Sequence, residues 1–237
     1  MKKRRLQRFV LLIEVGLLLA VIGAPLFLSR QRQHSLDRQL IAALKKNDTR
    51  HAMALLDEGA DPNTPCSPLP APTLEDLREY LICRYIVPDE ARLTPTAFMI
   101  ACGAVWDGEN FRAWQRRSND PHYDAPQLVQ AMLQHGAKIS GNRFGLTPLH
   151  WAASCGHLKT VRVLLDHNAD IDTQNWVGQT PLSLGVEAKA SAATLRLLLE
   201  RGANPNLPRR GPTPLQLAQK NKRPDLVALL RRSGAVK

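Results

Sequence analysis

A Thr-Pro pair recurs along the chain with a fixed spacing. It occurs at residues 94–95, 147–148, 180–181 and 213–214. The last three pairs are 33 residues apart, and 53 residues separate the first from the second. A repeat of this length is typical of a solenoid, in which each unit is too small to bury its own apolar face and is stabilised by stacking on its neighbours.

Two further markers follow the same period. A pair of large apolar residues lies late in each unit, at 55–56, 132–133, 164–165, 198–199 and 229–230. A Gly-Ala or Asn-Ala pair comes shortly after it, at 59–60, 136–137, 168–169, 202–203 and 234–235. Threonine before proline is typical of a helix N-cap, and glycine just after a helix allows a left-handed backbone. Each unit is therefore predicted to hold a pair of helices.

The best-formed unit resembles the ankyrin repeat. The resemblance is carried by Thr147-Pro148-Leu149-His150-Trp151-Ala152-Ala153, then Gly156-His157-Leu158, Val161, Leu164-Leu165 and Asn168-Ala169-Asp170. It implies a mainly α solenoid with a β-hairpin and two antiparallel helices per repeat. It also implies a protein-binding module that is not an enzyme, with contact through the concave face formed by hairpin tips and first helices.

The repeat domain is predicted to occupy residues 36–237, in about five units. Their expected bounds are 36–66, 91–140, 141–173, 174–206 and 207–237. Two insertions, near residues 67–90 and 103–123, break the period. Insertions in solenoids often lie on the binding face, and a lid over the neighbouring groove is the alternative.

The N-terminal segment predicts a membrane anchor. Residues 1–8 form a basic tail, and residues 9–28 are apolar except for Glu14. Twenty helical residues span about 30 Å, the thickness of the hydrocarbon core, so we expect one transmembrane helix followed by a linker at 29–35. A cleaved signal peptide is the alternative. The basic tail favours a cytoplasmic N-terminus, which places the repeat domain on the non-cytoplasmic side, periplasmic in a bacterium.

The formal net charge of +11 is unevenly distributed. Residues 1–38 carry eight basic and two acidic residues, and residues 209–237 carry eight basic residues and one acidic residue. The body between them holds 16 basic and 18 acidic residues. This is not the continuous basic stripe of a nucleic-acid-binding domain, so we expect a protein partner and no nucleic acid.

The predicted partner-binding residues lie in the hairpins and first helices. Trp176 falls near the tip of the hairpin that opens the fourth unit, and Arg143 and Phe144 hold the equivalent place one unit earlier. Trp151, Arg209 and Arg210 complete the predicted contact set. Exposed aromatic and arginine side chains are typical interface anchors, and packing against the neighbouring hairpin is the alternative for Trp176.

The remaining candidate residues point away from catalysis. His150, His157 and His167 lie in one unit, where the resemblance implies a structural role for the first two, and we expect no metal, cofactor or small-molecule substrate. Cys66 and Cys83 flank the first insertion and would form a disulfide in an oxidising compartment, with reduced thiols as the alternative. A second hypothesis for function is an accessory subunit of a membrane complex, recognised through its transmembrane helix.

Overall fold

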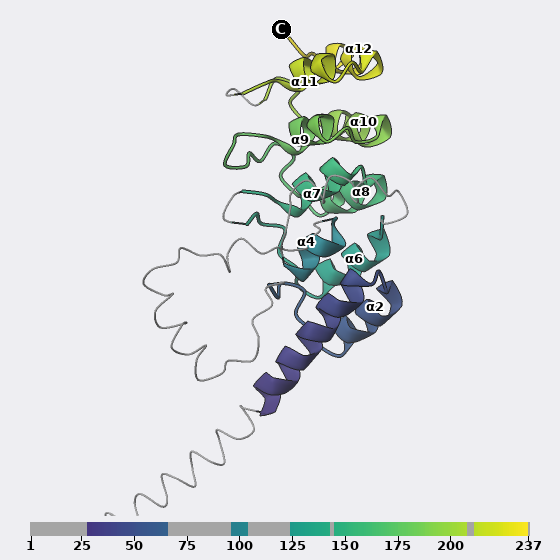
Figure 1. Ribbon diagram of the computed structural model, residues 1–237, viewed down its shortest axis with the longest axis vertical. Coiled ribbons are helices and arrows are strands. Elements are labelled where there is room, and N and C mark those ends of the chain that lie inside the picture. Colours follow the sequence, from purple (N-terminus) through teal and green to yellow (C-terminus); the bar gives the residue numbers. More distant parts are fainter. Residues whose placement is uncertain (1–27, 66–95, 104–123, 143–144, 208–210, 237) are drawn as a thin grey trace, which may run out of the picture.

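The computed structural model describes residues 28–65, 96–103, 124–142, 145–207 and 211–236. In this part of the chain, antiparallel helix pairs stack along one axis, with the C-terminal pair at one end (Figure 1). The first helices are 28–45, α4 (Ala97–Ala101), α7 (Pro148–Cys155), α9 (Pro181–Glu187) and α11 (Pro214–Lys220). The second helices are α2 (Thr49–Asp57), α6 (Pro126–Gln134), α8 (Leu158–Asp166), α10 (Ala192–Glu200) and α12 (Pro224–Arg232).

Like helices pack on like helices from one pair to the next. The helices α4, α7, α9 and α11 form one layer, and α2, α6, α8, α10 and α12 form the other. The mainly α class is confirmed in these residues. Small side chains allow the first layer to pack closely: a Cβ added at Gly185 of α9 would lie 3.1 Å from the Ala153 carbonyl oxygen of α7.

Three first helices begin as their Thr-Pro pairs predict. The hydroxyls of Thr147, Thr180 and Thr213 each accept a hydrogen bond from the backbone N–H three residues later. The side chain of that third residue bonds in return to the backbone N–H of the threonine, which completes a capping box. The third residue differs between helices, being His150, Ser183 and Gln216.

The prediction of the same cap at Thr94 is wrong. The N-cap of α4 is Thr96, whose hydroxyl accepts a hydrogen bond from the Met99 N–H. Long-range contacts explain the difference, because the N–H groups of Ala97 and Phe98 already donate to carbonyls of the 62–64 loop, at 2.8 and 2.9 Å. The first insertion therefore leaves and re-enters the solenoid at adjacent points.

The predicted β-hairpins are present as turns without β-strands in the described residues. Antiparallel pairing there is limited to an isolated bridge between Pro65 and Thr96. The turn before α7 is closed by a bond from the Asn142 N–H to the Leu146 carbonyl, and the turn before α9 by an equivalent bond at 2.9 Å. Pairing this short does not extend into a ladder.

Side-chain amides connect the loops that follow the second helices. Asn63 donates to the Gly136 carbonyl at 3.0 Å and accepts from the Lys138 N–H at 2.8 Å. Asn206 makes the same two bonds between the fourth and fifth pairs. It donates to the Gly234 carbonyl at 3.1 Å and accepts from the Val236 N–H at 2.8 Å. Each asparagine satisfies a donor and an acceptor of the neighbouring repeat.

Two side chains of the 28–45 helix reproduce this junction at the other end. Gln33 donates to the Gly59 carbonyl, and Asp37 accepts from the Asp61 N–H, both at 2.9 Å. Gln33 also bonds Asp37, which is buried. Together they supply the donor and the acceptor that a single asparagine supplies elsewhere. The 28–45 helix is thereby fixed to the first loop of the solenoid.

Asp172 occupies the corresponding position between the third and fourth pairs. It accepts from the Asn204 N–H at 3.0 Å, but a carboxylate has no proton to donate to the Gly202 carbonyl. We predict that Asp172→Asn supplies that donor and raises the free energy of unfolding by about 0.5–1 kcal/mol. Chemical denaturation measures this change.

The reverse substitution is the matched control. Asn206→Asp removes the bond to the Gly234 carbonyl and should lower the free energy of unfolding by a similar amount. Equal shifts of the same sign in the two variants would contradict the role assigned to the amide donor.

Most of the predicted transmembrane helix and both cysteines of the predicted disulfide lie outside the described residues. Residues 9–27, Cys66 and Cys83 lie outside the described residues. Within the described ranges, no helix has both the length and the apolar character needed to cross a bilayer. The 28–45 helix carries four charged residues between positions 30 and 38: Arg30, Arg32, Asp37 and Arg38.

Candidate functional site: the Trp176 turn and the helix-turn edge

Two adjacent residues with large, exposed apolar side chains lie at one turn of the described repeats. Trp176 is 73% exposed and Val177 is 54% exposed. They occupy the tip between α8 and α9, where residues 174–179 form what we call the Trp176 turn. An aromatic and an aliphatic side chain held in solvent at one place form a small apolar contact surface.

Asn175 fixes the backbone of this turn. Its buried side chain accepts from the N–H groups of Val177 and Gln179, at 3.0 and 2.9 Å, and donates to the Gln179 side chain at 3.2 Å. Its own N–H donates to the Gln179 carbonyl, and its carbonyl accepts from the Gly178 N–H. Local bonds therefore define the conformation in which Trp176 is presented.

A histidine of the preceding repeat, His150, forms a hydrogen bond to the backbone of the Trp176 turn. His150 Nδ1 accepts from the Thr147 N–H at 3.2 Å, which places the proton on Nε2. Nε2 lies 3.0 Å from the Gln179 carbonyl oxygen and donates to it. The capping box of α7 and the base of the Trp176 turn are thus joined by one imidazole.

Burial keeps this imidazole neutral. It lowers the pKa of His150 to about 4, against hydrogen bonding to Gln179 and the charge of Asp170, which both act to raise it. A charged imidazole would carry a proton on Nδ1 and lose the bond from the Thr147 N–H. His150 is therefore a structural group at neutral pH.

The neighbouring turn packs directly against the Trp176 turn. A Cβ added at Gly145 would lie 2.9 Å from the Gln174 carbonyl oxygen and 3.0 Å from the Asn175 Cα. Gly145 also has a φ of +69°, a conformation that glycine adopts without strain. A glycine is required here by both space and backbone geometry.

The six predicted contact residues divide into two groups. Arg143, Phe144, Arg209 and Arg210 lie outside the described residues. Trp176 is exposed, whereas Trp151 is only half-buried on α7 and packs partly against the core. The structure links these two tryptophans through His150, which adjoins Trp151 in α7 and bonds the Trp176 turn.

Two residues of this surface were not predicted. Val177 follows Trp176 directly. It lies 33 residues after Phe144, and this spacing could have predicted its place on the surface. Glu187, at the end of α9, accepts a hydrogen bond from the Gln179 side chain. That contact spans eight residues and depends on the rotamers of both side chains, so no sequence signal indicated it.

A second candidate surface is formed by the turns that join first helices to second helices. We call it the helix-turn edge and define it by residues 44–49, 101–103, 124–125, 155–160, 186–194 and 220–225. Contacts join its successive turns: Thr194 donates to the Gly156 carbonyl, and Asn221 donates to the Val186 carbonyl, each at 2.9 Å. Asp124 bonds to the N–H groups of Lys159 and Thr160 and so caps α8 from the preceding repeat.

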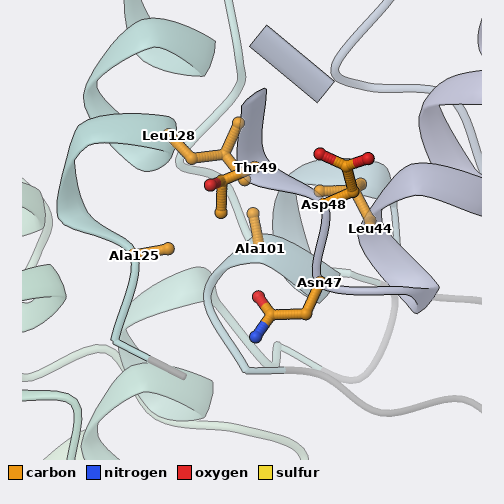
Figure 2. A pocket seen from close by; sticks show the side chains of 7 residues that line it. All are labelled: Leu44, Asn47, Asp48, Thr49, Ala101, Ala125 and Leu128. Carbon is orange, nitrogen blue, oxygen red and sulfur yellow. The ribbon is translucent and has the colours of Figure 1, made fainter. Parts of the chain in front are cut away.

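A shallow, open depression lies at the N-terminal part of this edge (Figure 2). Leu44, Asn47, Asp48 and Thr49 line it on one side, and Ala101, Ala125 and Leu128 line it on the other. Asp48 is engaged as the N-cap of α2, where it accepts from the His51 N–H at 3.0 Å. The lining is thus mainly apolar, without a free acid–base pair.

The buried thiols do not form a reactive centre. Cys102 and Cys155 are buried at the ends of α4 and α7 and are not joined in a disulfide. Burial raises the pKa of the Cys102 thiol well above its usual value, and the nearby Cys155 adds to this shift. Within the described ranges, no group of three His, Cys, Asp or Glu residues is arranged to hold a metal ion.

Comparison with known proteins agrees with the stacked helix pairs. Residues 121–175 match the family described as ankyrin repeats (3 copies). The chain contains ankyrin repeats. Ankyrin repeats are typical of protein–protein interaction modules, and this is the class of function that the match indicates.

Curated ankyrin-repeat relatives match a longer part of the chain. "Ankyrin repeat, SAM and basic leucine zipper domain-containing protein 1" of Carollia perspicillata is 41% identical over 107 residues, which cover 43% of this chain and 22% of that protein. The protein of the same name from Ornithorhynchus anatinus is 36% identical over 108 residues, 44% of this chain and 23% of the relative. The matched region therefore spans less than a quarter of these relatives, whose names denote domains and no enzyme activity.

The predicted localisation is wrong. We expected a single-pass membrane protein with its ankyrin repeats on the non-cytoplasmic side. The described residues contain no helix able to cross a bilayer, and the relatives are named for ankyrin-repeat, SAM and leucine zipper domains.

Neutral His150 makes the stability of the ankyrin repeats depend on pH. Its folded pKa of about 4 lies below the ordinary value of 6.5, so the unfolded state binds the proton more tightly. The contribution of neutral His150 to the free energy of unfolding is complete above pH 6.5. It falls by about 3 kcal/mol as the pH decreases toward 4. Chemical denaturation at several pH values measures the loss.

His150→Gln is the matched control, because Gln216 completes the same capping box in α11. The variant should lose this part of the pH dependence between 6.5 and 4, while carboxylate titration remains in both proteins. Identical pH profiles for the two proteins would contradict the assignment to His150.

Proposed function

We propose that the ankyrin repeats bind a protein partner through the Trp176 turn and the adjoining concave face. The observation that carries the proposal is the exposure of Trp176 and Val177 on a turn fixed by Asn175. An apolar side chain held in solvent gains free energy when a partner covers it. A turn ordered before binding loses little conformational entropy on association.

The neighbouring polar groups favour a partner with both apolar and polar contacts. Gln179 and Glu187 are bonded to each other beside the Trp176 turn and would border the apolar tip. Such a polar rim around an aromatic anchor is typical of protein interfaces. Arg143, Phe144, Arg209 and Arg210 belong to the same proposed surface by their 33-residue spacing.

Crosslinking from position 176 identifies the partner. A photoreactive phenylalanine analogue replaces Trp176 in the full chain, and a matched protein carries the analogue at Arg196, an exposed residue of α10. A partner crosslinked from 176 and not from 196 supports the proposed face. Equal yields from the two positions would contradict it.

Trp176→Ala then measures the contribution of the anchor. We expect it to weaken the affinity for that partner by about 10- to 100-fold, because a central aromatic residue often supplies much of the binding free energy. Titration calorimetry gives the affinity, and the melting temperature should stay within about 2 °C because the side chain is largely exposed. Unchanged affinity would exclude Trp176 as the anchor.

A further inference from the structure

We propose that the C-terminal part of the helix-turn edge is a second binding surface, for an acidic protein segment. Its exposed basic residues are Lys159, Lys189, Lys220 and Lys222. The bond from Asn221 to the Val186 carbonyl places the turns that carry Lys189 and Lys222 side by side. The hydrogen bond from Gln179 to Glu187 joins this surface to the Trp176 turn.

The acidic groups of this edge are already engaged in bonds of the fold. Asp124 caps α8, and Glu187 accepts from the Gln179 side chain. Asp225 forms a paired contact with Arg223, with bonds of 3.1 and 2.8 Å. No hydrogen bond or ion pair within the described residues joins the ammonium group of Lys189 or Lys222 to a carboxylate.

The backbone at two of these lysines is unfavourable for a lysine. Lys189 and Lys222 have φ values of +62° and +53°, in the left-handed region that favours glycine. Glycine fills the corresponding position in two preceding repeats, as Gly103 and Gly156. The chain thus carries a positive charge at places where a smaller residue would relieve strain, and strain of this kind is often retained at functional positions.

The mixture of charges favours a protein segment over a polyphosphate. A nucleic-acid backbone would bring regularly spaced phosphates against Glu187 and Asp225 as well as the lysines. A protein segment with separated carboxylates can meet each ammonium group individually. Lysine is also a point charge, without the planar fork with which arginine binds phosphate in two places.

A double variant, Lys189→Asn with Lys222→Asn, tests the proposal in the full chain. Asparagine tolerates the left-handed backbone, as Asn47 does at the equivalent turn of the first pair. The probe is a fluorescently labelled oligo-glutamate peptide, with affinity measured by anisotropy at low and at physiological ionic strength. We expect about fivefold weaker binding and a melting temperature that is unchanged or higher.

A second double variant controls for net charge. Lys138→Asn with Arg196→Asn removes the same two charges from exposed positions away from the edge. This control should bind the peptide as the parent chain does. Equal loss in both double variants, no peptide binding by the parent, or a fall in melting temperature for the edge variant would overturn the proposal. Tighter binding of a single-stranded oligonucleotide of equal charge, lost in the edge variant, would also overturn it, in favour of nucleic acid.

Discussion

Contact between successive repeats determines the rest of this structure. Each helix pair has an apolar face that only a neighbouring pair can bury, and the two layers of like helices provide that burial. Directional bonds then fix the register of the stack. Asn63 and Asn206 join loops at two junctions, and His150 joins α7 to the turn before α9.

The same bonds explain how insertions and an N-terminal helix are accommodated. Residues 62–64, which precede the first insertion, bond to the start of α4, which follows it, so the described repeats stack without a break. At the N-terminal end, Gln33 and Asp37 take over the bonding of a loop asparagine. The 28–45 helix can therefore occupy the place of a preceding loop while it remains a continuous helix.

Local chemistry made part of this fold predictable from sequence. The caps at Thr147, Thr180 and Thr213 depend on residues three positions apart, and all three formed as expected. The exposure of Trp176 followed from its place in a turn. Features set by distant contacts were missed: Thr96 replaced Thr94 as an N-cap because loop carbonyls bind the next two N–H groups.

Other parts of the site were hidden from sequence for the same reason. Asp124 caps α8 across 35 or more residues, and Glu187 reaches the Trp176 turn only through the side chain of Gln179. The prediction of a membrane localisation came from the basic tail at residues 1–8 and the apolar composition of residues 9–28, which carry no information about tertiary contacts. Spacing predicted the repeating elements well, whereas the pairings between repeats join side chains that are far apart in the sequence.

The central claim is that the Trp176 turn is formed before any partner binds. Amide hydrogen exchange of the free, full-length chain, read residue by residue by NMR, tests it most directly. The N–H groups of Asn175, Gly178 and Gln179 each donate within the turn, so they should exchange at least about 100-fold more slowly than in an unstructured peptide. Exchange of all three at the unstructured rate would show that the turn is not preformed and would contradict the account.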